Sequence, residues 1–401
     1  MRILKIWDGE YPWDVRAEKV SRALTSGGHE VHMVARNRDH RVLRERLEEC
    51  TVHRLAPWSL LGGNLDAASQ FPAFFNPRWL ALVMRVARAE RCEAILVRDL
   101  PLAPTAIAAG RLLGLPVVLD MAENYPAMIR DLWDTGSTRF GDALVRNPRA
   151  VEAVERWTLK RVAHTLVVVE ESRDRLVERL GTPAARITVV GNTPSISRLE
   201  GQPLRHAAKP SDGAKSLEIV YLGLLEHARG VGTVIEAVAR CRALGVGVRL
   251  TVIGDGRARG DFEEQLRRLG VGPDAVRLLG FLPYAEALGI VAQAEVGIIP
   301  HLANESWNTT IPNKLFDYMA AGLCVITSDA RPARRVVEEE GAGHAFTSGS
   351  VDSLVEVMRR LWDAQDAAEY GRRGQAAIRS RYHWEIDERR LLDVFAALDG
   401  R

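Results

Sequence analysis

Short apolar segments rich in Val, Ile and Leu alternate with amphipathic segments along almost the whole chain. Continuous apolar segments of this kind predict strands that are buried on both faces, as in a parallel sheet covered by helices. The expected strands are 2–6, 30–35, 94–98, 116–120, 165–169 and 187–190, followed by 217–223, 248–254, 275–280, 295–300 and 323–327.

The segments between these strands carry helical periodicity and recognisable ends. Residues 15–28 place apolar side chains at helical spacing and finish in two glycines, and residues 231–245 repeat the arrangement and end at Gly245. Glycine suits the positive φ at which helices commonly end. Repeated strand–helix units of this kind predict doubly wound α/β sheets.

One stretch interrupts the pattern. Residues 199–216 are rich in Gly, Pro, Ser and charged residues and have no apolar period, which indicates a linker. A chain of 401 residues is too long for one ordinary core and suits two α/β domains. We therefore predict an N-terminal domain over 1–198 and a second domain over 217–384, with a last amphipathic helix within 385–401.

Composition narrows the class of protein. The net charge of +2 gives no general case for nucleic-acid binding. The four cysteines form no Cys-x-x-Cys pair, which argues against a zinc site or a disulfide framework and favours a reducing cytoplasm. No apolar segment is long enough to cross a bilayer. An aromatic and basic stretch over 71–86 could lie at a membrane interface, although core packing is the simpler interpretation.

Ligands of open parallel sheets collect outside the carboxyl ends of the strands. After the strand 217–223, Arg229 precedes a glycine at the start of a helix, where its planar guanidinium could bind a pyrophosphate. Gly223, Gly254 and Gly256 follow buried strands and permit either tight turns or close backbone approach by a ligand. Both interpretations stay open for the Gly-Asp-Gly turn.

The segment 301–329 is the most informative part of the chain. Thr310 suits the cap and Pro312 the first turn of a helix, whose free amides and dipole attract an anion. Lys314 and Asp317 lie three residues apart and therefore share a helix face. Lys314 would add positive charge beside a phosphate, and Asp317, one turn further along, could accept hydrogen bonds from a ribose diol.

Together these features resemble family 4 retaining glycosyltransferases of the GT-B fold. The resemblance implies two facing Rossmann-like domains, with a C-terminal helix that crosses back to the first domain. The helix PNKLFDYMAAG is similar to that of transferases that build bacterial capsules, O-antigens and other surface glycans. The similar stretches are VYLGLLEHARGVGTVIEAV, TVIGDGR, VRLLGFLPYAEAL, AEVGIIP and PNKLFDYMAAGLCVITSD in the second half, and RAEKVSRALTSGGHEVHMV, GLPVVLDMAENYP and ITVVGNTP in the first.

The resemblance implies that the second domain binds a nucleoside diphosphate sugar, with uridine as the expected base and no other cofactor. Arg229 matches a phosphate-binding lysine and Asp317 a ribose-binding glutamate, so both join Lys314 as expected catalytic residues. Because no Asp-x-Asp pair follows a strand, we also expect no required metal ion. The expected donor contacts are Gly223, Gly254, Gly256, Phe281, Leu282, Asn308, Thr309, Thr310, Ile311 and Asn313.

The chain departs from the family pattern at several positions. Thr309 stands where the E-x7-E motif opens with glutamate, and Glu305 is the candidate substitute for that contact with the donor sugar. Leu224 replaces an arginine, and Ala122 replaces a frequent histidine of the first-domain crevice. Because of these departures, two alternatives stay open: the donor is atypical, or the activity is lost.

The expected reaction transfers a hexosyl unit to a hydroxyl acceptor with retention of the anomeric configuration, and the departing phosphate can take the acceptor proton. The acceptor, whether a glycan, a lipid-linked sugar or a small molecule, should lie against the first domain. The protein is expected in the cytoplasm, either free or in peripheral contact with the inner membrane. The candidate acceptor contacts follow two strand ends and are Glu10, Tyr11, Asp14, Arg16, Glu123 and Asn124.

Two other functions fit a similar scaffold. A nucleotide-sugar epimerase would need acid and base groups at the sugar, for which the 301–317 loop offers only His301 and Glu305. A non-catalytic sugar-nucleotide-binding subunit is compatible with Thr309 and Leu224. A nicotinamide dehydrogenase is disfavoured because no G-x-G-x-x-G follows the first strand.

Overall fold

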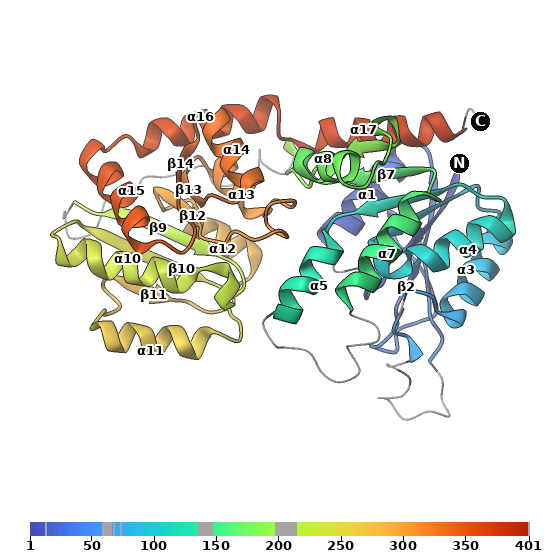
Figure 1. Cartoon of the computed structure of the whole chain (residues 1–401), viewed down its shortest axis with the longest axis horizontal. Helices are drawn as coiled ribbons and strands as arrows, with labels where there is room; N and C mark the ends of the chain where they lie inside the picture. The colour runs from blue at the N-terminus through green and yellow to red at the C-terminus, as the bar shows by residue number, and fades with distance from the viewer. Residues whose placement is uncertain are drawn as a thin grey trace. The chain divides into compact units, whose positions relative to one another are not determined.

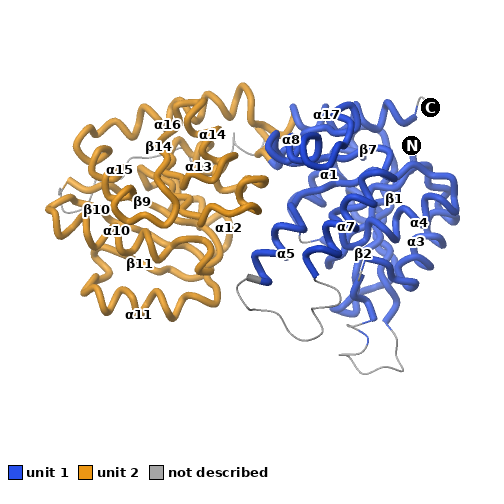
Figure 2. The backbone as a smooth tube through the Cα atoms, viewed as in Figure 1, with its two compact units in different colours: residues 1–192, 386–401 blue, residues 193–385 orange. Residues whose placement is uncertain are grey.

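A computed structural model (Figure 1) describes most of the chain. The chain divides into two compact units, Met1–Asn192 with Ile386–Arg401 and Thr193–Glu385, which are coloured separately in Figure 2. The expected linker over 199–216 lies outside the described residues except at its last two positions. The described residues are 1–12, 14–57, 66, 69–72, 74–134, 147–196 and 215–399.

The first unit contains an eight-stranded sheet with the order β3-β4-β2-β1-β5-β6-β7-β8. Neighbouring strands run parallel except at one edge, where β3 pairs antiparallel with β4. The apolar pattern does not predict these two strands, because their sequences, RER and TVHR, are almost wholly polar. The strands are β1 (Arg2–Ile6), β2 (Glu30–Ala35), β3 (Arg44–Arg46), β4 (Thr51–Arg54), β5 (Ala94–Arg98), β6 (Val117–Met121), β7 (His164–Val167) and β8 (Ile187–Val189).

Asparagine caps followed by proline start two helices of this unit. The side chains of Asn76 and Asn147 accept hydrogen bonds from the first-turn amides of α3 and α7, and the next residue in each case is proline, whose fixed φ suits the first helical position. The helices are α1 (Val15–Ser26), α3 (Pro77–Ala89), α4 (Ala103–Leu113), α5 (Tyr125–Asp134), α7 (Pro148–Leu159), α8 (Glu170–Glu178) and α17 (Trp384–Asp399).

Core packing accounts for part of the aromatic stretch over 71–86. Trp79 on α3 is fully buried, and its indole Nε1 donates to the carbonyl of Gln70 at 2.8 Å. The C-terminal helix α17 also packs within this unit, because a Cβ placed on Gly27 at the end of α1 would lie 2.4 Å from the Leu392 side chain. Among the described helices, none combines the length and apolarity that a membrane crossing requires.

The second unit contains a parallel six-stranded sheet with the order β11-β10-β9-β12-β13-β14. The apolar pattern does not predict β14, whose sequence GHAF is short and opens with glycine. The strands are β9 (Leu217–Leu222), β10 (Val248–Ile253), β11 (Val276–Leu278), β12 (Val296–Ile299), β13 (Cys324–Ser328) and β14 (Gly343–Phe346). The helices are α10 (Val231–Ala243), α11 (Arg259–Leu269), α12 (Tyr284–Val291), α13 (Lys314–Ala321), α14 (Arg331–Glu339), α15 (Val351–Ala364) and α16 (Ala367–Ser380).

Candidate functional site

Helix α13 begins at Lys314, later than the sequence predicted. Asn313 occupies the cap position with helical backbone angles (φ −55°, ψ −35°) and makes no side-chain cap hydrogen bond. Thr310 is therefore not the helix cap, and Pro312 precedes the first turn instead of opening it. The physical reason is burial: Thr310 and Ile311 are both only 7% exposed, so they form part of the packed approach to the helix.

Tyr318 fixes α13 against the end of β9. Its hydroxyl oxygen accepts a hydrogen bond from the backbone amide of Leu222 at 2.8 Å, and the whole residue is buried. Gly297 on β12 makes room for the ring, because a Cβ at this glycine would lie 2.3 Å from it. This packing carries Lys314 and Asp317 to the carboxyl end of β9.

Lys314 directs a buried amine towards that strand end. The residue as a whole is half-buried, but its Nζ is covered and has no hydrogen-bond partner among the described residues. The Nζ lies 4.1 Å from the centroid of the Tyr221 ring, and a Cβ built on Gly223 would be 2.6 Å from it. An unpaired buried amine is costly, so its retention here points to a ligand.

Two further basic groups, Arg229 and His301, share the site. Arg229 ends a short 3-10 turn, His227–Arg229, before α10. Its guanidinium lies 4.6 Å from the centroid of the Trp307 ring, and its Nη1 is 3.4 Å from Nε2 of His301. His301 is buried, and its Nδ1 has no hydrogen-bond partner among the described residues.

Burial and neighbouring positive charge lower the pKa of Lys314 and of His301. Burial and then the charge of Arg229 hold the pKa of Lys314 well below its ordinary value of 10.5, although Asp317 opposes the shift. Burial, Lys314 and Arg229 similarly lower the pKa of His301. An anion bound between them would reverse the repulsion, so the arrangement can stabilise negative charge.

Backbone packing explains the glycines of the β10 loop. A Cβ on Gly254, which has φ +136°, would lie 1.9 Å from the carbonyl oxygen of Gly223. A Cβ on Gly256 would lie 2.4 Å from the carbonyl oxygen of Leu225. The loops after β9 and β10 therefore pack backbone to backbone, and this close approach accounts for both residues without a ligand.

Asp317 lies beside the segment expected to meet the nucleobase. The hydroxyl of Tyr284, the first residue of α12, donates to Oδ1 of Asp317 at 3.3 Å. Tyr284 follows Phe281, which is 83% exposed, and half-buried Leu282 within the same short loop. The residues predicted to contact the ribose and the base are thus brought together, and Tyr284 is a member of the site that the motif comparison missed.

The side chains of Asn308 and Thr309 are occupied within their own fold. Oδ1 of Asn308 accepts from the backbone amide of Arg331 at 3.0 Å, at the start of α14. The hydroxyl of Thr309 is buried and donates to the carbonyls of Glu305 and Ser306 at 3.0 and 3.2 Å. The Thr309 hydroxyl is therefore engaged within its own turn and does not replace the missing glutamate, whereas Asn313 is exposed.

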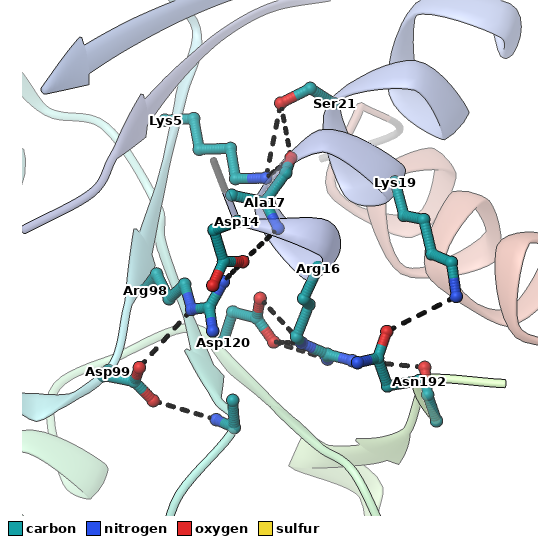
Figure 3. Close-up of polar contacts among 12 residues, drawn as sticks. Lys5, Asp14, Arg16, Ala17, Lys19, Ser21, Arg98, Asp99, Asp120 and Asn192 are labelled. Carbon is teal, nitrogen blue, oxygen red and sulfur yellow. Dashed lines mark hydrogen bonds and ion pairs between the residues drawn. The ribbon is translucent and has the colours of Figure 1, made fainter. Parts of the chain in front are cut away.

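Two predicted acceptor contacts in the first unit are structural residues. Tyr11 is fully buried, and its hydroxyl donates to Glu49 at 2.7 Å. Arg16 is 2% exposed and forms an ion pair with Asp120 at 2.6 Å, as Figure 3 shows. Neither side chain reaches the surface, and both stabilise strand ends. Their contact with an acceptor stays a prediction, which this burial does not favour.

The remaining acceptor candidates differ in their surroundings. Asp14 caps α1 by accepting from the Ala17 amide at 2.7 Å, and it also pairs with Arg98. Oε1 of Glu10 accepts from the Arg38 amide at 2.7 Å. The buried Oε2 of Glu10 has no hydrogen-bond partner within the described part of the chain. After β6, Glu123 is exposed, whereas Asn124 is buried and caps α5 through the Ala127 amide at 3.3 Å.

Asp99, directly after β5, was missed by the sequence reasoning. Its backbone angles (φ 58°, ψ 173°) lie in a region that is almost restricted to glycine and that recurs at functional sites. Its Oδ1 accepts from the Ala122 amide at 3.0 Å, and its Oδ2 lies 3.4 Å from Nε of Arg98, a contact that Figure 3 shows. Burial raises the pKa of Asp99, with Arg98 opposing the shift. The only signal in the sequence is an aspartate at a strand end.

Comparison with known proteins matches both halves of the chain to glycosyl transferase families. The glycosyl transferase 4-like domain family matches residues 14–193, and the family "Glycosyl transferases group 1" matches residues 216–364. Glycogen synthase of Mycobacterium tuberculosis is 26% identical over 252 residues, which cover 62% of this chain and 58% of that protein. The chain thus spans little more than half the length of the curated relatives it matches.

Solved structures resemble the chain over its full length. Sucrose-phosphate synthase from Thermosynechococcus elongatus has a TM-score of 0.77 at 15% identity, with 100% of this chain and 99% of that chain covered. HepE of Anabaena, in complex with UDP-glucose, has a TM-score of 0.69 at 16% identity, with 99% and 100% covered. Two largely parallel, helix-covered sheets, together with these full-length structural matches, define a protein of the GT-B fold. With a glycosyl transferase 4-like domain followed by a group 1 domain, the chain belongs to the family 4 glycosyltransferases.

Proposed function

We propose that this protein transfers a hexosyl unit from a nucleoside diphosphate sugar to a hydroxyl acceptor, with retention of the anomeric configuration. The observation that carries the proposal is the buried Nζ of Lys314, which lies in one site with Arg229 and His301 and has no hydrogen-bond partner in the part of the chain that the structure describes. A diphosphate would give these groups a partner. The same groups would stabilise the negative charge that develops on the leaving diphosphate as the glycosidic bond breaks.

The nucleoside would lie along α13 and the loop before α12. Asp317 would accept hydrogen bonds from the ribose, and its contact with Tyr284 supports this placement because it joins the ribose and base segments. Phe281 is highly exposed and could cover the base. Uridine is the proposed base, and the complex of HepE with UDP-glucose supports this choice.

The acceptor would bind the first unit at the carboxyl ends of β1, β5 and β6. Glu10 and Glu123 remain candidate contacts, and Asp99 joins them because its strained backbone holds a carboxylate at the same edge of the sheet. The acceptor is a hydroxyl of a glycan, a lipid-linked sugar or a small molecule. Peripheral contact with a membrane would bring a lipid-linked acceptor within reach.

Binding measurements with matched nucleotides test the donor site. Calorimetric titration should show tighter binding of UDP or UDP-glucose than of UMP, because only the diphosphate reaches both Arg229 and Lys314. Arg229→Gln should weaken the diphosphate by about 10- to 100-fold, the equivalent of a lost charge-assisted hydrogen bond, and leave UMP much less affected. Arg267→Gln is the matched control, since Arg267 on α11 is 75% exposed.

Product analysis then tests the reaction. With a panel of hydroxyl acceptors, the new glycosidic bond should have the same anomeric configuration as the donor. Equal affinities for UMP and UDP, or unchanged diphosphate binding by Arg229→Gln, would contradict the donor site. Isomerised donor formed without any acceptor would favour the epimerase alternative, and binding without transfer or hydrolysis would favour a non-catalytic subunit.

A further inference from the structure

Two buried histidines and a glutamate meet near one edge of the first unit's sheet. His32 on β2 and His53 on β4 share a face, because Val34 pairs with His53 and lies two residues from His32 on the same strand. His32 is 1% exposed and His53 8%. Glu90, which follows the last turn of α3, completes the group, and one ligand atom from each residue lies within 4.8 Å of the others.

The spacing of the two histidines matches a tetrahedral metal site, and Glu90 lies close enough to complete it. Nδ1 of His32 is 3.4 Å from Nε2 of His53, and this Nε2 is 3.8 Å from Oε1 of Glu90. Zinc–nitrogen bonds of about 2.0–2.1 Å place two ligands of a tetrahedral ion about 3.3 Å apart. We infer that His32, His53 and Glu90 bind a divalent transition-metal ion of the zinc class, with water as the fourth ligand.

The neighbours of the histidines support this ligand set. Oε1 of Glu30 lies 3.3 Å from Nε2 of His32, on the far side of the ring from His53. A carboxylate beside the second ring nitrogen is the usual way in which a metal-binding histidine is oriented, and this Nε2 has no hydrogen-bond partner among the described residues that would compete with Glu30. Nη2 of Arg44 is 3.2 Å from Oε1 of Glu90, but the Arg44 side chain is 66% exposed and can turn into solvent when an ion replaces it.

The site joins segments that are distant along the chain and has no part in sugar transfer. His32 lies in the first half of β2, whereas ligands of open parallel sheets collect at the carboxyl ends of the strands. The ion would link β2, β4 and the end of α3, and so fasten the outer strands to a covering helix. Nitrogen ligands favour zinc, cobalt or nickel over calcium and magnesium.

The test uses the untagged full-length chain after treatment with a chelator and dialysis. Titration with Zn²⁺ should show one ion bound per chain and a higher unfolding temperature, since an ion that binds only the native state stabilises it. Co²⁺ should give the visible absorption bands of a tetrahedral site. His53→Gln and Glu90→Gln should each weaken Zn²⁺ binding by at least about 10-fold.

His344→Gln is the matched control, because His344 is a half-buried histidine of the second unit and packs edge-on against Tyr370. It should bind Zn²⁺ as the wild type does. If His53→Gln fails to fold, Glu90→Gln still tests the metal site. The Glu90 side chain is 23% exposed, so this substitution should leave the fold intact. No Zn²⁺ uptake by the wild type, or equal affinity in Glu90→Gln and the control, would overturn the inference.

Discussion

Replacing Lys314 with methionine should separate stability from donor binding. Methionine keeps most of the length and apolar stem of lysine but removes the buried Nζ, which has no hydrogen-bond partner among the described residues. Leaving such a group buried costs about 1–3 kcal/mol, so the ligand-free variant should be more stable by about that amount. For a domain of this size the unfolding temperature should rise by about 2–4 °C per kcal/mol.

The gain in stability of Lys314→Met over the wild type should depend on pH in a defined direction. Burial and Arg229 lower the pKa of Lys314 in the folded chain, whereas the unfolded chain keeps the ordinary value of 10.5. Between these two pKa values the unfolded state binds more protons, so the stability of the wild type rises with pH through this window. Below the lowered pKa the full cost of the buried charge applies. Lys314→Met should lack this dependence.

Donor binding should change in the opposite sense. A hydrogen bond between a charged lysine and a phosphate contributes about 1.5–3 kcal/mol, which is about 10- to 150-fold in affinity for UDP-glucose. Urea denaturation across a pH series and calorimetric titration measure the two effects on the same samples. Lys160→Met, an exposed lysine after α7, should change neither quantity. A variant that is less stable and still binds UDP-glucose normally would refute the reasoning.

Two further substitutions test the scaffold. Gly254→Ala should destabilise the fold by about 1–3 kcal/mol in urea denaturation, because the new Cβ would lie 1.9 Å from the Gly223 carbonyl oxygen. The control is Gly260→Ala on α11, which should not destabilise the fold because its Cβ would meet nothing within 4 Å. Asp120→Asn should lower the free energy of unfolding by about 3–5 kcal/mol, because it leaves Arg16 as a buried charge without its carboxylate partner. A loss below about 1 kcal/mol in the same urea measurement would show that the pair is not buried in solution. Burial alone would raise the pKa of Asp120, but the charge and hydrogen bonds of Arg16 outweigh it and lower the pKa, so this pair's contribution should be lost as pH falls below the ordinary value of 3.8.

The sequence predicts strands well where burial on both faces makes them continuously apolar. All the strands expected from the apolar pattern are present, and their ends match the expected ones to within two residues. The pattern fails for β3, which is a polar edge strand, and for β4 beside it, whose only apolar residue is Val52 although His53 and Arg54 are also buried. Strand β14 is missed for a different reason: Gly343 has φ +158° and lies against the Val325 carbonyl, so close packing of backbone, not apolar content, sets its start.

Motif spacing predicts which residues gather at the donor site, but not how their side chains are engaged. Lys314 and Asp317 share a face of α13, as a spacing of three residues requires. Motif spacing alone does not reveal that the Thr309 hydroxyl bonds to carbonyls of its own turn. It also cannot reveal that Tyr11 is buried, because that burial depends on packing between distant segments. His301 was considered only for an epimerase, since its contact with Arg229 spans more than seventy residues.

A comparison of two buried lysines shows why partners matter more than burial when function is inferred. Lys5 in the first unit is fully buried, and burial lowers its pKa to about 7. Its Nζ, however, donates to the Ala17 carbonyl at 2.6 Å and to the Ser21 hydroxyl at 3.3 Å, so the fold itself satisfies it (Figure 3). Lys314 shows the same downward shift without any such partner among the described residues. A shared shift in pKa therefore cannot distinguish a structural lysine from a ligand-binding one, whereas the presence or absence of a hydrogen-bond partner for the buried amine can.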